Sequence, residues 1–207
     1  MSVTVVTYDR VMGRWEPNAR GRLAQAALAL YAEQGFEQTT AAEIARAAGL
    51  TERSFFRHFP DKREVLFYGM DSVRDLVVQV IADAPSSAGP MEAIGEALAA
   101  VGAMVQETPE FAAKRNGIVS ANAELREREL VKLAEVAGAM AGALRDRGVP
   151  ELTASLATET GIVVYRVAFA RWIGEPGRAD LPELLVQTMS ELKDVVAGRL
   201  ASSPALS

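Results

Sequence analysis

Apolar residues recur at helical spacing along nearly the whole chain, and no clean alternating run is bounded by hairpin turns. In the first predicted helix, from about Pro17 to Gln34, Leu23 and Ala27 share one face. Glycine and proline stops and capping residues divide the rest of the chain into helices expected at about 40–49, 51–58, 61–84, 91–106, 108–120, 122–148, 150–174 and 180–200. The pattern predicts an all-α fold of nine helices, without strands and without an internal repeat.

Capping residues mark where several of these helices begin. A capping box, in which the first side chain and the fourth satisfy each other's backbone N–H groups, is expected at three places: Thr40 with Glu43, Asp61 with Glu64, and Asp180 with Glu183. Asn122 is expected to cap the helix that follows it. The second box is expected to open one continuous helix that runs towards Ala84.

The amino-acid composition excludes several kinds of catalytic and metal-binding site. The 207 residues include no cysteine and one histidine, so disulfides, thiolate sites and sites with two imidazoles are excluded. We expect no catalytic site, no metal and no cofactor. No apolar run reaches the roughly 18 residues of a membrane helix, and the first residues lack a secretion signal. The chain is therefore expected to be cytoplasmic and to have no membrane partner.

Charge is unevenly distributed along the chain. The formal net charge is −5, yet residues 1–67 hold nine Lys and Arg against eight Asp and Glu. The remaining 140 residues hold 13 against 19. A mildly basic N-terminal part ahead of an acidic body allows phosphate binding at one end only.

The most informative stretch is 40–58, where two short helices flank a tight turn. Gly49 is expected to supply the left-handed backbone of a helix–turn–helix corner. Arginine side chains donate to guanine edges and to phosphates, and an aromatic ring packs against thymine methyl groups, so an exposed aromatic between arginines suits a major groove. Helix N-termini favour phosphates. The residues expected to contact DNA are Thr40, Thr51, Glu52, Arg53, Ser54, Phe56, Arg57, His58 and Lys62.

Three runs carry a family resemblance. They are GFEQTTAAEIA at 35–45, AGLT at 48–51 and SFFRHFPDK at 54–62, and they resemble the N-terminal signature of tetracycline-repressor-type (TetR) regulators. The resemblance covers about residues 17–68. Two departures are Phe56, where the family most often has tyrosine, and the acidic Glu52 on the recognition helix. The segment 114–130 is also similar to the branch that contains mycofactocin-system regulators.

The resemblance implies a nine-helix TetR-like fold and a homodimer. It implies a helix–turn–helix DNA-binding domain at 16–68 and a ligand-binding and dimerisation domain at 69–201. Residues 1–15 lack a helical pattern and are expected to form a flexible arm, and residues 202–207 are expected to be a frayed tail. The implied partners are a double-stranded, palindromic DNA operator and a small-molecule effector. The effector is expected to be largely apolar and to release a repressor from its operator.

Two sets of residues in the body are candidates for these roles, although ordinary core is the simpler reading of the first set. The ligand-binding candidates are Met104, Phe111, Met140, Tyr165, Phe169 and Trp172. The dimer-interface candidates, on the broad apolar faces of the last two helices, are Leu152, Leu156, Ile162, Val163, Leu184, Leu185, Met189 and Leu192. The basic pair Lys114 and Arg115 is expected to be a solvated face.

Two other functional classes, an enzyme and a protein-binding adaptor, are alternatives. An enzyme would need a paired carboxylate, a nucleophile with its base, or a metal cluster, and the acids here are scattered mainly on helix exteriors. A helical adaptor would use its helix–turn–helix to bind protein. Within the family, activation is the alternative to repression.

Overall fold

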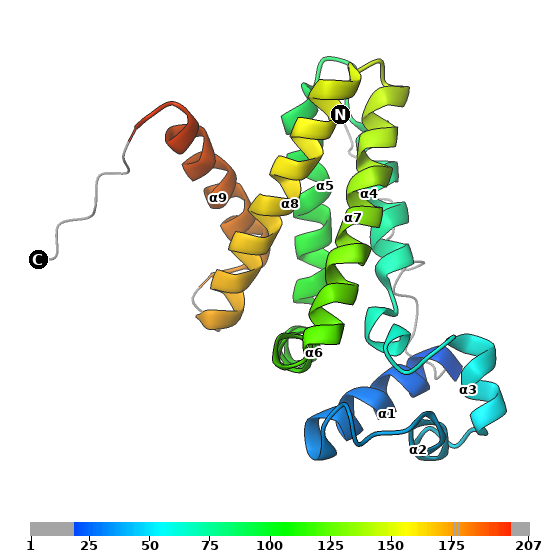
Figure 1. Ribbon diagram of the computed structural model, residues 1–207. Helices are drawn as coiled ribbons and strands as arrows, with labels where there is room; N and C mark the ends of the chain where they lie inside the picture. Colours follow the sequence, from blue (N-terminus) through cyan, green and yellow to red (C-terminus); the bar gives the residue numbers. More distant parts are fainter. Residues whose placement is uncertain (1–18, 176, 178, 200–207) are drawn as a thin grey trace, which may run out of the picture. The chain divides into compact units, whose positions relative to one another are not determined.

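The computed structural model describes residues 19–175, 177 and 179–199. This part of the chain is all-α, as the hydrophobic pattern predicts, and contains nine α-helices and one short 3-10 helix (Figure 1). The elements are α1 (Ala19–Gln34), α2 (Ala41–Ala47), α3 (Glu52–His58), the 3-10 helix η2 (Glu64–Phe67), α4 (Met70–Asp83), α5 (Pro90–Gln106), α6 (Pro109–Ala121), α7 (Ala123–Asp146), α8 (Glu151–Gly174) and α9 (Leu181–Val196). The predicted arm at 1–15 and tail at 202–207 lie outside the described residues.

The chain divides into two compact units. Unit 1 holds residues up to Ser72 together with Lys114–Glu129, and unit 2 holds Val73–Ala113 and the residues from Leu130 onwards. Three helices, α4, α6 and α7, therefore have residues in both units. The predicted domains are separated by a single boundary after residue 68, whereas unit 1 also includes residues 114–129.

Unit 1 is built around the packing of α1, α2, α3 and η2. The first two of the short helices are well capped: Thr40 forms a complete capping box with Glu43, and the Thr51 side chain accepts from the backbone N–H of Ser54. Gly49 has a φ of +68°, so the predicted left-handed corner between α2 and α3 is confirmed. Leu23, Ile44 and Phe55 are fully buried, and they form the centre of this small core.

The segment after α3 differs from the prediction. The carboxylate of Asp61 does cap the next turn, because its Oδ1 accepts from the backbone N–H groups of Arg63 and Glu64. The turn is a 3-10 helix, however, and the helical backbone is interrupted at Gly69, whose φ is +101°, before α4 begins. The prediction of one continuous helix over 61–84 is wrong. The Glu64 carboxylate also accepts from the side chain of Arg128, a contact that the sequence does not predict.

Two further caps differ from the prediction. Asp180 makes no side-chain cap at α9, and the backbone N–H of Leu181 donates instead to Oε1 of Gln106 at 2.6 Å. The side-chain amide of Asn122 donates to the carbonyl of Ile118 at 2.7 Å, so it closes the end of α6 rather than opening α7. In both places a long-range or backward contact replaces the local cap that the sequence favours.

Unit 2 is a helical body in which α5, α8 and α9 pack on one another (Figure 1). Two glycines allow the closest approaches. A Cβ at Gly161 of α8 would lie 2.7 Å from Cγ2 of Ile94 on α5, and a Cβ at Gly102 of α5 would lie 2.7 Å from Cδ1 of Leu185 on α9. Helix α9 buries Leu181, Leu184 and Leu185 in this way, and Met140 of α7 is fully buried in the same unit. Across the described ranges, no helix has the length and apolar content needed to span a bilayer.

Candidate nucleic-acid interface

Helix α3 presents one face to solvent and anchors the other in unit 1. Phe55 is fully buried, and its ring meets that of Phe56 edge-on, with centroids 5.4 Å apart. Phe56 itself is 51% exposed. Glu52, Arg53 and Arg57 are exposed as well. The outward face of α3 is therefore an aromatic ring flanked by two arginines and one acid.

The Thr51 and Ser54 side chains belong to the N-terminal cap of α3. Their hydroxyl oxygens lie 3.0 Å apart, and Thr51 accepts from the backbone N–H of Ser54 at 3.2 Å. Ser54 is half-buried, whereas Thr51 is exposed. The Ser54 hydroxyl lies beside the exposed Thr51, and its contact with DNA stays a prediction.

His58 is more enclosed than its helical position suggests. The side chain is half-buried, and its Nε2 is buried without a hydrogen-bond partner among the described residues. Burial lowers the pKa of His58, and the positive charges of Arg57 and Arg20 lower it further. His58 is thus less accessible than Arg53 and Arg57, and its contact with DNA stays a prediction.

Lys62 has a structural role that the sequence did not reveal. Its ammonium donates to the carbonyls of Phe36, Glu37 and Thr39 at 2.8, 3.2 and 3.1 Å, and it lies 4.4 Å from the centre of the Phe36 ring. All three N–H donors are thus used on the loop between α1 and α2. This corrects the expectation that Lys62 reaches for a phosphate.

Thr40 is also engaged locally. Its backbone N–H and its hydroxyl both donate to Oε2 of Glu43 at 2.8 Å. The two hydrogen bonds from Thr40 lower the pKa of the Glu43 carboxyl, with a further contribution from Arg46. A phosphate at the N-terminus of α2 would have to share these donors with a carboxylate. Thr40 remains a predicted contact, as do Thr51, Glu52, Arg53, Phe56 and Arg57.

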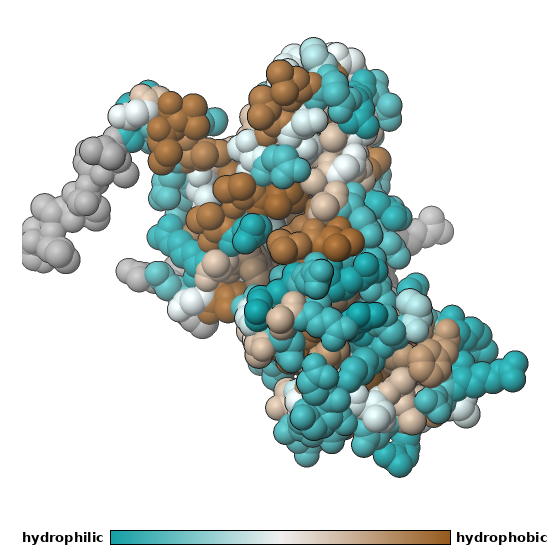
Figure 2. Space-filling model, in the orientation of Figure 1, coloured by the Kyte–Doolittle hydropathy of each residue, from teal (hydrophilic) through white to brown (hydrophobic). Residues whose placement is uncertain are grey.

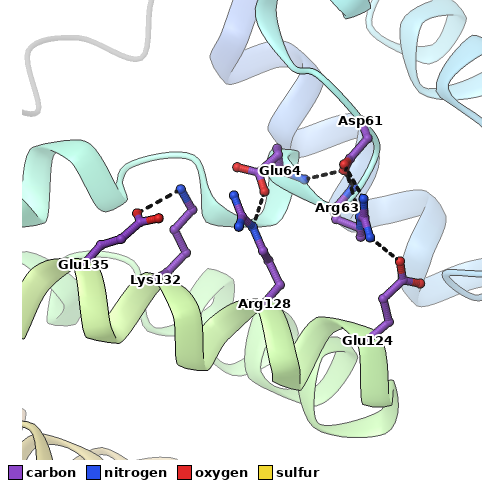
Figure 3. Close-up of polar contacts among 7 residues, drawn as sticks. All are labelled: Asp61, Arg63, Glu64, Glu124, Arg128, Lys132 and Glu135. Carbon is purple, nitrogen blue, oxygen red and sulfur yellow. Dashed lines mark hydrogen bonds and ion pairs between the residues drawn. The ribbon is translucent and has the colours of Figure 1, made fainter.

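A cluster of charged residues in unit 1 was missed by the sequence interpretation. Arg115, expected on a solvated face, is half-buried: its Nε donates to the Leu66 carbonyl, its Nη1 to Glu129 at 2.8 Å, and its guanidinium lies over the Phe67 ring. Arg128 binds Glu64, and Arg63 binds both Asp61 and Glu124 (Figure 3). Lys132 and Glu135, drawn in the same figure, pair with each other along α7. The contacts of Arg115 with Leu66, Arg63 with Glu124 and Arg128 with Glu64 join residues 49 to 64 positions apart, so no local pattern marks them.

The ligand-binding candidates all lie in unit 2 and are only partly gathered together. Tyr165 and Phe169 stack with centroids 5.6 Å apart, and Trp172 follows at 5.9 Å from Phe169, so α8 carries a row of three rings. Met140 and Trp172 are buried, whereas Met104 and Phe111 are half-buried. Among the described residues, no group of three or more His, Cys, Asp or Glu side chains is arranged to hold a metal ion.

The dimer candidates divide into two groups. Leu152, Leu156 and Val163 are 72%, 61% and 52% exposed, whereas Leu184 and Leu185 are each only 3% exposed. The latter two pack inside unit 2, so their assignment to an interface is wrong, because α9 turns that face onto its own subunit. Ile162, Met189 and Leu192 are half-buried. Helices α8 and α9 also expose Val167, Val186, Val195 and Val196, of which Val196 lies on the apolar face expected for the last helix.

Comparisons with known proteins agree with this arrangement. Residues 23–68 match the family of bacterial regulatory proteins of the tetR type, and residues 88–197 match the MftR C-terminal domain. The second match alone covers more than half of the chain. The chain belongs to the TetR family of bacterial transcriptional regulators.

Curated relatives match over less than half of the chain. The chain is 34% identical over 82 residues to the HTH-type transcriptional regulator TcmR of Streptomyces glaucescens, which is 40% of this chain and 36% of that protein. It is 40% identical over 58 residues to the HTH-type transcriptional repressor KstR2 of Mycobacterium tuberculosis, 28% of each chain. The match thus spans about a third of the length of these relatives.

Solved structures share the fold over most of the chain. FadR of Thermus thermophilus, a TetR-family repressor in complex with lauroyl-CoA, is 23% identical with a TM-score of 0.55, covering 91% of this chain and 98% of that one. FadR of Bacillus subtilis in complex with stearoyl-CoA is 19% identical with a TM-score of 0.61, covering 83% and 96%. At these identities the likeness shows the fold.

Proposed function

We propose that this protein is a dimeric transcriptional repressor that binds a palindromic operator through α3 and is released by a small, largely apolar molecule. The observation that carries the proposal is the outward face of α3, where Phe56 is 51% exposed between Arg53 and Arg57. An exposed ring is costly in water. It gains in a major groove, where it contacts thymine methyl groups while the arginines reach guanine edges or phosphates.

Dimerisation is needed because a single helix–turn–helix domain, called a head below, binds DNA weakly. Residues 1–67 carry one more basic than acidic side chain, so phosphate neutralisation by one subunit contributes little affinity. Two linked heads bind together when their separation matches the spacing of the half-sites, about 34–36 Å for one helical turn.

The dimer surface that fits best is an apolar stripe on unit 2. On α8 it comprises Leu152, Leu156, Val163 and Val167, which follow one another at helical spacing, and α9 adds Val186, Val195 and Val196. Figure 2 shows apolar surface gathered over these two helices. Several exposed apolar side chains grouped on neighbouring helices in this way are typical of an interaction site. Two helices from each subunit would form a four-helix interface, of the size that obligate dimers bury.

The effector is proposed to bind in unit 2 beside the row of rings on α8. Tyr165 and Trp172 combine apolar surface with a polar group that can orient a ligand. The acyl-CoA complexes of the two FadR proteins make a ligand with an apolar chain the first class to test. A ligand that prefers a head separation unsuited to DNA lowers operator affinity, and a 100-fold release requires a difference in affinity of about 2.7 kcal/mol between the two states.

The test combines DNA binding with a ligand probe. Purified protein is titrated into labelled fragments from its own upstream region at low salt, with and without lauroyl-CoA. We expect retarded complexes of dimer stoichiometry that need Arg57, and their partial dissociation by the probe. Binding that survives both Arg57→Ala and added salt would favour the protein-binding adaptor, and no DNA binding at all would contradict the proposal. An increase in transcription from a bound promoter would indicate an activator.

A further inference from the structure

The segment after α3 is fixed firmly to the rest of the DNA-binding helices. Phe59 is 2% exposed, and its ring contacts those of Phe55 at 5.7 Å and Tyr68 at 6.2 Å between centroids. The guanidinium of Arg20 lies 5.4 Å from the centres of the Phe59 and Tyr68 rings. The residues at both ends of the segment 60–67 are therefore in contact with α1, and Phe59 also contacts α3.

The same segment is held from its other side by residues 115–129. Arg115 donates to the Leu66 carbonyl at 2.8 Å and covers the Phe67 ring, while Arg128 binds the Glu64 carboxylate (Figure 3). We call Glu64, Arg115 and Arg128, with the Leu66 carbonyl and the Phe67 ring, the arginine clamp. All of its members belong to unit 1, although the helices that carry the two arginines continue into unit 2.

Burial decides which of the ionic contacts matter. The side chains of Glu64 and Arg115 are 15% and 18% exposed, so removing a partner leaves a poorly hydrated charge. Arg63 and Glu124, 2.5 Å apart, are 40% and 48% exposed, and such a pair is well screened by water. The clamp should therefore hold the segment, whereas the Arg63–Glu124 pair should add little.

We infer that Arg115 and Arg128 are positioning residues for operator recognition, because they clamp the segment that carries α3 through Glu64 and the Leu66 carbonyl. The inference rests on the proposed function. It goes beyond it in naming side chains that touch no DNA but set where the recognition helix is held. A well-held head accepts one half-site spacing, and a loosened head accepts several.

Amide hydrogen exchange of the full-length protein tests the clamp without DNA. Glu64→Gln and Arg128→Gln should each raise exchange in residues 61–68 by about tenfold. Because the two act as a pair, the double variant should exchange no faster than the faster single variant. Glu124→Gln is the matched control and should leave exchange unchanged. Unchanged exchange in the clamp variants, or multiplied effects in the double variant, would overturn the inference.

A second measurement tests its consequence for recognition. An operator is selected by the wild-type protein from random palindromes and is then lengthened by one base pair between its half-sites. Glu64→Gln should bind the selected operator about tenfold more weakly and lose less affinity on lengthening than the wild type. Equal spacing discrimination in both proteins would overturn the inference. Failure of the wild type to select any operator would contradict the proposed function, and the exchange measurement would still decide whether the clamp holds.

Discussion

The hydroxyl of Tyr31 donates to the backbone carbonyl of Lys62 at 2.6 Å, while the ammonium of Lys62 donates to three carbonyls between α1 and α2. Each residue thus fixes a segment that is distant in sequence. Together they hold the chain on both sides of the helix–turn–helix, so that α3 is presented from a rigid frame. The proposed DNA contacts depend on this frame, although neither of these two side chains is placed to read bases.

This pair predicts a loss of stability above pH 10. Burial raises the pKa of the Tyr31 hydroxyl, and the nearby charge of Asp61 raises it further. The unfolded chain begins to ionise near the ordinary pKa of about 10, whereas the folded protein keeps its proton. Stability is therefore fully present below about pH 10 and falls as the pH rises beyond it. Urea denaturation at pH 8 to 11 should show a smaller decline for Tyr31→Phe than for the wild type. An equal decline would contradict the assignment.

Lys62→Met tests the role given to the ammonium. The variant keeps the apolar stem but loses the three donors, so the free energy of unfolding should fall by about 1.5–3 kcal/mol. Arg46→Met removes an exposed charge on α2 and should change stability by less than about 0.5 kcal/mol. If Lys62→Met left stability unchanged but weakened DNA binding, a phosphate contact would be restored as the better interpretation.

Arg147 is predicted to hold the C-terminal end of α4. Its guanidinium donates to the carbonyl of Ile81 in the last turn of α4 and to those of Ala84, Pro85 and Ala88 in the loop that follows. Arg147→Met should lower the free energy of unfolding by about 2–3 kcal/mol in urea titrations. Arg145→Met is the control, because Arg145 pairs with an exposed Glu151 at 3.3 Å, and it should cost less than about 1 kcal/mol. Equal losses in both variants would refute the proposed anchoring.

Gly161→Ala should destabilise unit 2. The added methyl would lie 2.7 Å from Ile94, and overpacking of this kind costs about 1–3 kcal/mol. The same change at Gly138, an exposed position of α7 with nothing within 4 Å, should stabilise the helix by about 0.5–1 kcal/mol. Thermal unfolding of the two variants should therefore shift in opposite directions, and shifts in the same direction would count against close α5–α8 packing.

The apolar stripe on α8 predicts a specific defect in association. Leu156→Glu places a charge at a position that is 61% exposed in one subunit, so the monomer should stay folded while the dimer dissociates. Sedimentation velocity should show the monomer, with helicity unchanged by circular dichroism. Leu184→Ala, at a position 3% exposed, should instead lower stability by about 2–5 kcal/mol. A Leu156→Glu variant that stays dimeric would move the interface elsewhere.

Most of the helices could be predicted from the sequence, because helical periodicity, capping residues and glycine stops are local signals. Gly49 and the Thr40–Glu43 box illustrate this, since each works within four residues. Three kinds of feature could not be predicted. Gly69 interrupts a segment that reads as one helix, and Lys62 and Arg115 find backbone carbonyls 23 to 49 residues away. The buried face of α9 depends on which neighbour covers it, so Leu184 and Leu185 could be recognised as apolar but not as core.

The central claim is that Arg53, Phe56 and Arg57 on α3 bind DNA. Fluorescence anisotropy with an operator selected by the wild-type protein tests it most directly, over a series of salt concentrations. The account predicts that affinity falls steeply with salt, that Arg57→Ala weakens binding by at least about tenfold, and that Arg145→Met behaves as the wild type. Binding that is insensitive to salt and to Arg57→Ala would contradict it.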